Sequence, residues 1–282
     1  MENISTTTHI ENVLNYYNDC WLTRFEQGHN PISHAMHMGY FENGISNNDE
    51  AKQRMNMFLA SQLGLEGNSP KTVVDAGCGI GSSVLYLAEN FSNIEIKAIN
   101  ISESQIGLAK SFYAADLTRS SIEFLCTDYC DTSLPDESAD VVYALESLCH
   151  ASKKELFFAE ANRILKKGGR LIIIDYTNSG SSDNNNCRAL LNEFSEGWAV
   201  NEYLVYNEEV IKKTGFTKID KSSLLQYVKR GIDYSSAKAL KKLSDPDNRL
   251  TSAFTRHLKA CIALKKLVEL NGIDYSMIKC FK

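Results

Sequence analysis

The sequence predicts an α/β protein built on a doubly wound, mostly parallel sheet of about seven strands, with helical cap segments. Short β-branched runs alternate with helical stretches through the middle of the chain, as is typical of parallel strands joined by helices. A glycine-rich loop follows the first of these runs and opens a helix. We therefore expect a ligand at the carboxyl ends of the strands.

The central region is expected to contribute five strands and three helices. The strands are expected at residues 72–74, 94–99, 122–125, 141–145 and 171–174. The helices are expected at 82–90, 102–115 and 154–165, the last of them ending at the basic residues and glycines 166–169. A short helix at 210–213 then precedes two further strands at 216–219 and 275–281. These seven strands make up the predicted sheet.

Two helical segments depart from this alternation, so we divide the chain into four parts. They are an N-terminal helical cap (1–68), a cofactor-binding core (69–224), a helical lid insertion (225–271) and a final strand of the core (272–282). In the cap, Leu14, Tyr17, Trp21 and Phe25 follow a helical period, and Ser46 with Asp49 resembles a capping box of a helix that ends near Gly64.

Composition and charge exclude several classes of protein. The 282 residues carry a net charge of −5, which does not favour binding to nucleic acid or to anionic lipid. No apolar run is long enough to span a membrane, and the first residues do not resemble a signal peptide. The 8 cysteines are scattered without metal-site spacing, so we expect reduced thiols, no metal and a cytoplasmic protein without stable membrane insertion.

The glycine-rich loop spans residues 75–81, Asp-Ala-Gly-Cys-Gly-Ile-Gly. A nicotinamide dinucleotide would require G-x-G-x-x-G and an acid about 20 residues further on. This chain instead has G-x-G-x-G, and Asn100 ends the second strand. Asp75, directly before the glycines, is suited to face an ammonium group of a ligand.

The ordered motifs resemble those of the class I S-adenosylmethionine-dependent methyltransferases. Residues 75–81 resemble their first motif, and 99–105 are similar to a stretch found in the branch of sterol, tocopherol and cyclopropane-fatty-acid methyltransferases. Asp128-Tyr129 matches the acidic position that holds the adenine amine, and 165–170 resembles the turn before the fifth strand. Ala98 and Lys167 depart from the family's Gly and Pro. The resemblance covers about residues 51–216 and implies a Rossmann-like methyltransferase fold with S-adenosylmethionine as methyl donor.

The resemblance, with the aromatic N-terminal segment, implies which residues hold the cofactor. They are Tyr17, Tyr40, Asp75, Gly77, Cys78, Gly79, Asn100, Ile101, Gln105, Thr127, Asp128, Tyr129 and Leu145. Structural roles remain open for several of them. Gln105 is placed to complete a capping box with Ser102, Asp128 to cap a turn, and Cys78 to pack in the core. Tyr17 and Tyr40 equally fit an aromatic stripe in the core.

The reaction is expected at the carboxyl end of the fourth strand, where Glu146 and His150 resemble the E-[AS]-x-x-H segment of sterol-type C-methyltransferases. If an alkene attacks the methyl group, a carboxylate can stabilise the resulting carbocation while a base takes a proton. If a hydroxyl or amine attacks, the same residues would act as base and orienter. A histidine with a purely structural hydrogen bond is the other reading of His150. Trp198 and Tyr203 are candidates either for walls of the acceptor pocket or for lid packing.

Three functions follow from these residues. The first is C-methylation of an isoprenoid- or terpenoid-like small molecule, and the second is O- or N-methylation of a natural product or amine. The third is a binding module that keeps the fold without the reaction. No nucleic-acid partner is expected, because the chain lacks both a basic patch with interleaved aromatics and the N-P-P-[YF] tetrapeptide. The pair Lys153-Lys154 lies close to His150 and could contact a diphosphate, but two adjacent lysines at the start of a helix equally fit a solvated surface, so we predict no diphosphate ligand.

Overall fold

The computed structural model describes residues 6–22, 34–42, 44–67, 69–113, 121–178, 185–200, 204–205 and 208–282. Phe25 and Tyr203, singled out in the sequence, lie outside the described residues, and for Trp21 only the backbone is described.

The core is one mostly parallel sheet in the order β3-β2-β1-β4-β5-β8-β7. Its parallel strands are β1 (Lys71–Ala76), β2 (Ile94–Asn100), β3 (Ser121–Cys126), β4 (Ala139–Leu145) and β5 (Leu165–Asn178). The strand β8 (Ile273–Phe281) runs antiparallel between β5 and β7 (Lys218–Ser223). A two-residue strand, β6 (Leu204–Val205), also pairs with β5. The predicted doubly wound, seven-stranded sheet is therefore confirmed, with β6 added to it.

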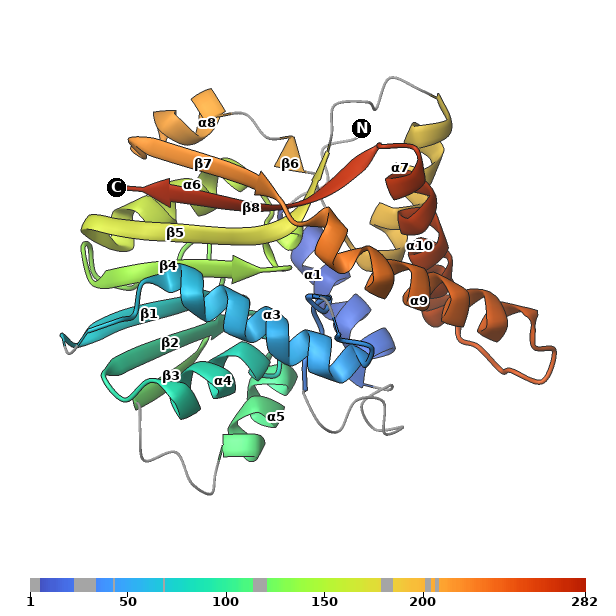
Figure 1. Ribbon diagram of the computed structural model, residues 1–282, viewed down its shortest axis with the longest axis horizontal. Coiled ribbons are helices and arrows are strands. Elements are labelled where there is room, and N and C mark those ends of the chain that lie inside the picture. Colours follow the sequence, from blue (N-terminus) through green and yellow to red (C-terminus); the bar gives the residue numbers. More distant parts are fainter. Residues whose placement is uncertain are drawn as a thin grey trace.

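Helices cover both faces of this sheet (Figure 1). Successive residues of a strand face opposite sides, so Val73 of β1 packs with α3 (Asn48–Leu63) and α4 (Ser82–Asn90). Its neighbour Val74 packs on the other face with α6 (Lys154–Ile164) and α8 (Glu208–Lys213). The helix α5 (Glu103–Tyr113) connects β2 to β3.

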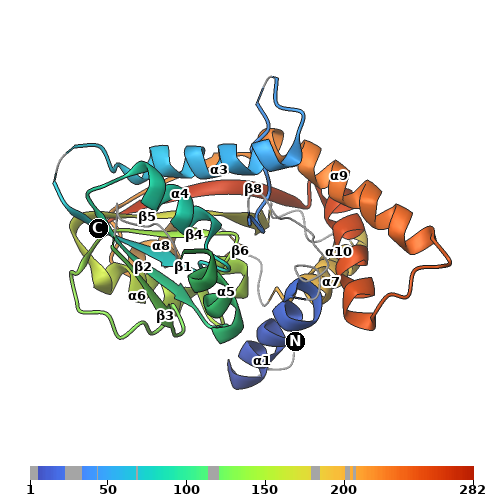
Figure 2. The same cartoon turned by 90° about the horizontal axis from the view of Figure 1, so that it is seen from below.

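The remaining helices gather beyond the carboxyl ends of the parallel strands (Figures 1 and 2). They are α1 (Thr6–Tyr16), the π-helical turn η1 (Tyr17–Leu22), α7 (Asn185–Trp198), α9 (Leu225–Ser244) and α10 (Ser252–Glu269). A short 3-10 turn, η2 (Leu148–His150), follows β4. These elements enclose the edge of the sheet at which open α/β folds bind their ligands.

Some element boundaries differ from the predictions for local reasons. Asn47, not Ser46, caps α3, because its side chain accepts a hydrogen bond from the N–H of Asp49 at 2.8 Å. The helix ends as expected at Gly64, with φ of 66°. Residues 166–169 lie within β5 instead of ending α6, and the strand expected at 216–219 starts at Lys218.

Packing crosses the predicted division of the chain in two places. Met55 and Leu59 of α3 are fully buried in the same cluster as Val73, so this helix of the predicted cap packs on the sheet. The helix α7 of the predicted core packs on α10 of the predicted lid, where a Cβ added to Gly197 would meet the Cβ of Ala260 at 2.5 Å. In the described part of the chain, no helix is both long and apolar enough to cross a membrane.

Candidate active site

Three connected cavities lie at the carboxyl end of the sheet, and we name them by position. The outer chamber, of about 490 Å³, lies between α3, α9 and α10. The middle cavity, of about 100 Å³, contains Asp75, Glu146 and His150, and shares Met36, His37 and Trp198 with the outer chamber. The inner cavity, of about 40 Å³, contains Asn100 and Asp128, and it shares Tyr17, Gly77, Gly79 and His150 with the middle one.

The glycine loop forms the wall between the middle and inner cavities. Gly77 has φ of 106°, and a Cβ at this position would meet the Cβ of Ser147 at 2.3 Å. The N–H groups of Gly77 and Cys78 both donate to Ile99 O, at 3.0 and 2.9 Å. The loop therefore packs directly on the turn after β4, and only glycine fits at residue 77.

Asp75 is buried next to this loop and lines the middle cavity. The hydroxyl of Tyr143 donates to its Oδ2 at 2.6 Å. Burial raises the pKa of Asp75 to about 7, against the opposing effect of this hydrogen bond. A cationic group in the cavity would restore the charge of the carboxylate, so the position suits an ammonium ligand.

Asn100 and Gln105 meet at the floor of the inner cavity. The amide of Asn100 donates to Gln105 Oε1 at 2.7 Å and to Gly79 O at 3.3 Å. Ser102 Oγ accepts from the N–H of Gln105 at 3.3 Å, which is half of a capping box. The side chain of Gln105 is bonded to Asn100, so it does not complete the box.

Three more of the predicted cofactor residues, Ile101, Asp128 and Tyr129, line the inner cavity. Asp128 also accepts from the N–H of Cys130 at 2.8 Å, so it caps a turn as well. Thr127 is not among the lining residues of the three cavities, and its hydroxyl instead donates to Asp131 O at 3.3 Å within the turn. The cofactor role of Thr127 therefore stays a prediction.

The two predicted N-terminal tyrosines have different positions. Tyr17 lines the middle and inner cavities. Tyr40 is buried with its ring stacked between those of Phe58 and Tyr227, at centroid distances of 4.7 and 4.3 Å. It is not among the lining residues of the cavities. The stacking is the core-packing alternative of the sequence analysis, and the cofactor role of Tyr40 stays a prediction.

Glu146 lines the middle cavity with Leu145 and Cys78, directly after β4. Its backbone has φ of 50°, a left-handed conformation that is uncommon outside glycine and that turns the chain toward the cavity. Its Oε1 accepts from the N–H of Met38 at 2.6 Å and from the hydroxyl of Tyr275 at 2.7 Å. Burial raises the pKa of Glu146 to about 7 despite these donors.

His150 lines the middle and inner cavities, and each nitrogen of its ring has a hydrogen-bond partner. The hydroxyl of Tyr17 lies 2.9 Å from Nε2, and Ala199 O lies 3.1 Å from Nδ1. Because a carbonyl can only accept, Nδ1 carries the proton and Nε2 accepts from Tyr17. Burial lowers the pKa of His150 to about 4, so the imidazole is neutral at pH 7. Glu146 and His150 share the cavity, but each has its own hydrogen-bond partners.

Tyr176 and Tyr275 of the site were missed in the sequence, whereas Trp198 was already a candidate for a pocket wall. The hydroxyl of Tyr176 and the indole N–H of Trp198 are buried at the middle cavity without a hydrogen-bond partner in the described part of the chain. Tyr275 and Met38, which hold Glu146, lie 129 and 108 residues from it. No local pattern indicates such pairs.

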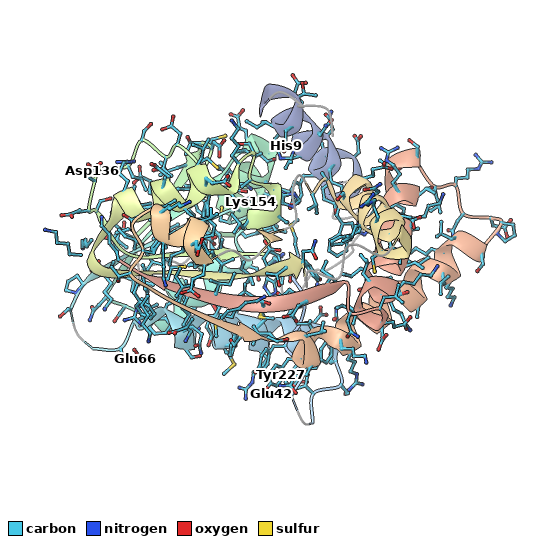
Figure 3. The ribbon with its side chains drawn as sticks, turned by 90° about the horizontal axis from the view of Figure 1, so that it is seen from above. His9, Glu42, Glu66, Asp136, Lys154 and Tyr227 are labelled. Atoms are coloured by element: carbon cyan, nitrogen blue, oxygen red, sulfur yellow. The ribbon has the colours of Figure 1, made fainter. Side chains whose placement is uncertain are left out.

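Lys154, considered for a diphosphate contact, is buried and donates to Cys149 O and Ala151 O, both at 3.2 Å. Figure 3 shows Lys154 at the start of α6 on the same side of the molecule as His9 of α1. Because its ammonium group bonds to backbone carbonyls, Lys154 stabilises the turn after β4. No cluster of metal-binding side chains occurs within the described ranges.

The residues present fit S-adenosylmethionine. The unpartnered Tyr176 and Trp198 groups are donors, which suits the α-carboxylate of this ligand, and Asp75 suits its ammonium group. Asn100, Gln105 and Asp128 supply polar atoms beside the inner cavity for ribose and adenine. Fold and site together are similar to those of the class I S-adenosylmethionine-dependent methyltransferases, and the cavity residues fit S-adenosylmethionine as a methyl donor.

Comparison with known proteins agrees with this class. A family model described as a methyltransferase domain matches residues 74–173, from β1 to β5. The chain is similar to the sterol 24-C-methyltransferase erg-4 of Neurospora crassa, with 32% identity over 137 residues, 49% of this chain and 35% of that protein. The chain thus spans about a third of the length of this relative.

Two further similarities cover more of the chain. The O-methyltransferase resE of Aspergillus sclerotiorum is 26% identical over 209 residues, 73% of this chain and 77% of that protein. The structure of the cyclopropane synthase MmaA2 from Mycobacterium tuberculosis superposes with a TM-score of 0.82 at 19% identity, covering 97% of this chain and 98% of that one. This last likeness extends the shared fold to the helices around the cavities.

Proposed function

We propose that this protein transfers the methyl group of S-adenosylmethionine to a carbon atom of a small, largely apolar acceptor, of the isoprenoid or terpenoid alkene class. The observation that carries the proposal is Glu146 in the middle cavity, where Oε1 accepts hydrogen bonds from two neutral donors. Neither donor cancels the charge of the ionised carboxylate. A negative charge in a small cavity suits a reaction that develops a positive charge on the acceptor.

Bound S-adenosylmethionine supplies an electrophilic methyl group on a sulfonium. In C-methylation, the π electrons of the acceptor form the new carbon–carbon bond and leave a carbocation on the acceptor. The ionised Glu146 stabilises this cation electrostatically, because water screens little in a closed cavity. Loss of a proton from the neighbouring carbon then turns the C–H electron pair into the new double bond.

Two groups in the middle cavity can take this proton. Glu146, with a pKa of about 7, is partly ionised at neutral pH and is therefore a competent base. The second group is the pair of Tyr17 and His150, in which the phenol oxygen accepts a proton as its own proton passes to Nε2 over 2.9 Å. Because the pKa of His150 is lowered to about 4, the imidazole is a weaker base than Glu146.

O-Methylation is the second candidate, and the Tyr17–His150 hydrogen bond is the observation that favours it. A hydroxyl acceptor must lose a proton as it attacks, and a neutral imidazole with a relay can receive that proton. The similarity to an O-methyltransferase over 73% of the chain supports the same reading.

The test is mass spectrometry of reactions with methyl-deuterated S-adenosylmethionine and a panel of prenyl diphosphates, sterols, phenols and amines. Label on a carbon atom of an isoprenoid, lost in Glu146→Gln, is the expected result. Label on oxygen or nitrogen would replace the proposal with the second candidate. Tight cofactor binding without label in any member of the panel would contradict both.

A further inference from the structure

Asp175 is a buried carboxylate that lies behind the wall of the middle cavity. It is only 1% exposed, and it is not among the lining residues of the three cavities. Its neighbours do line the middle cavity. Tyr176 follows it in β5, and Glu146 donates its N–H to the carbonyl of Ile174, the residue before Asp175, at 2.8 Å. Asp175 is therefore placed to act on the site without touching a ligand.

The carboxylate of Asp175 holds the turn that carries His150. Its Oδ2 accepts from the N–H of Cys149 at 3.0 Å, and its Oδ1 accepts from the N–H of Tyr176 at 2.7 Å. The first bond joins η2 to β5, because Cys149 is the middle residue of η2. An Asn at this position would present one oxygen and one amide nitrogen to the two N–H groups, so one of the bonds would be lost.

The negative charge of Asp175 also acts on Glu146. Burial is the largest cause of the raised pKa of Glu146, and the charge of Asp175 raises this pKa further, whereas Lys52 lowers it. Burial raises the pKa of Asp175 itself to about 6, with Lys154 partly opposing this effect, so Asp175 is mostly ionised at pH 7. The titratable groups that face the two carboxylates are Tyr17, Lys52, Cys149, Lys154, Tyr176 and Tyr275. Burial raises the pKa of the three tyrosines and of Cys149, so these groups stay neutral near pH 7.

We propose that Asp175 is a positioning residue of the active site, which fixes the turn that carries His150 and acts electrostatically on Glu146 from behind the cavity wall. The ionised Asp175 opposes the ionisation of Glu146, because two negative charges in a poorly screened interior repel each other. Asp175 thus helps to keep Glu146 a base that titrates near neutral pH. This inference rests on the proposed function and adds a second carboxylate that sets the pH range of the site.

The direct test is an NMR titration of the Glu146 carboxyl carbon, assigned through the backbone, in the full chain. In Asp175→Asn, the midpoint of this titration should fall by about 0.5 to 1 pH unit, because one repelling charge is removed. An unchanged or higher midpoint would overturn the proposal.

Thr177→Val is the matched control for loosening of the strand. Thr177 lies two residues after Asp175 in β5, is fully buried, and its Oγ1 lies 2.9 Å from Oγ of Ser276. The variant removes this hydrogen bond but no charge, so it should lower stability and leave the midpoint of Glu146 unchanged. A fall equal to that in Asp175→Asn would assign the shift to loosening and refute the electrostatic role.

Glu146→Gln supplies a second measurement, which does not require Asp175→Asn to fold. Repulsion between two groups is mutual, so this variant should lower the titration midpoint of the Asp175 carboxyl carbon by a similar amount. A midpoint that stays at the wild-type value would show that the two carboxylates are not coupled, contrary to the proposal.

Methyl-transfer kinetics test the positioning role. At pH 8, kcat of Asp175→Asn should lie about tenfold below wild type, because the turn that carries His150 loses a bond to β5. The rise in kcat from pH 6 to pH 8 should shrink from roughly tenfold to roughly two- to fourfold, since more of Glu146 would already be ionised at pH 6. A wild-type kcat at pH 8 would contradict the positioning role, and a tenfold rise would contradict the electrostatic one.

Failure of this inference can be distinguished from failure of the proposed function, because the NMR midpoints need no turnover. Unchanged midpoints with label on carbon would remove only the role of Asp175. Shifted midpoints with label on oxygen would remove only C-methylation.

Discussion

Replacing Glu146 by Gln removes one negative charge from the middle cavity and leaves the shape of the side chain unchanged. Gln retains an oxygen for the N–H of Met38 and the hydroxyl of Tyr275, which lie 2.6 and 2.7 Å from Oε1. Removing one group that is positioned to stabilise transition-state charge costs about a hundredfold to a thousandfold in rate. We expect kcat to fall by that factor, while the affinity for S-adenosylmethionine changes by less than about threefold. Initial rates with labelled cofactor and calorimetry measure the two quantities.

The pH profile tests whether the lost charge is the cause. With a pKa of about 7, Glu146 is about one-tenth ionised at pH 6 and about nine-tenths ionised at pH 8. The wild-type kcat should therefore rise roughly tenfold between these values, and Glu146→Gln should lack this rise. A variant that retains the wild-type rate, or the same rise with pH, would refute the role of the carboxylate.

The same carboxyl group should make the free energy of unfolding fall as pH rises, while kcat rises over the same range. The pKa of Glu146 is raised from 4.5 to about 7, so the folded state binds more protons than the unfolded state between these pH values. Stability should fall as pH rises through this window, by about 1 to 3 kcal/mol given that Glu146 is only partly buried. Glu146→Gln should therefore be more stable than wild type at pH 8 and nearly equal at pH 4 in urea unfolding. If the variant were less stable than wild type at pH 8, the ionised carboxylate would not destabilise the folded state.

Two further substitutions test the cavity walls. Tyr17→Phe removes the hydroxyl 2.9 Å from Nε2 of His150 and should lower kcat about tenfold with cofactor affinity preserved, as measured by steady-state kinetics and calorimetry. An unchanged kcat would exclude Tyr17 from proton transfer. Gly77→Ala should cost at least about 3 kcal/mol in urea unfolding and weaken cofactor binding, because φ is 106° and the new Cβ would lie 2.3 Å from that of Ser147. Gly67→Ala is the control, since φ is 98° but nothing lies within 4 Å, so it should cost only about 1 to 2 kcal/mol. Equal costs would mean that backbone conformation alone, without the contact to the turn after β4, explains the requirement for glycine.

The central strands β1, β4 and β5 were predictable because burial on both faces requires continuous apolar runs, which are a local property of the sequence. The length of β5 was not predictable in the same way. Residues 170–178 pair with β8 about 100 positions later, from Arg170 with Phe281 to Asn178 with Ile273. The cap of α3 was misassigned because Ser46 and Asn47 are both competent caps, and only the backbone conformation decides between them.

Prediction of the site from the sequence is limited in the same way, because contacts between distant parts of the chain leave no local pattern. Glu146 and His150 were placed by a motif that lies on one short segment after β4. Tyr40 fitted the same aromatic pattern as Tyr17, but tertiary packing stacks its ring between Phe58 and Tyr227. A periodic stripe of aromatics indicates a buried face and does not distinguish a packed interior from a cavity wall. That distinction depends on neighbours from distant parts of the chain.

The N-terminal segment does more than cover the cavities, because it also fixes His150. His9 Nε2 donates to the carbonyl of His150 at 2.8 Å, and Tyr17 donates to its ring at 2.9 Å. The adjacent Tyr16 bonds to Nδ1 of His257 on α10 at 3.1 Å. Consecutive tyrosines, the last residue of α1 and the first of the π-helical turn, thus connect α10 and the turn after β4. Tyr17 also lines the middle and inner cavities. The hydrogen bond that orients His150 therefore requires the N-terminal segment to pack against the ligand site.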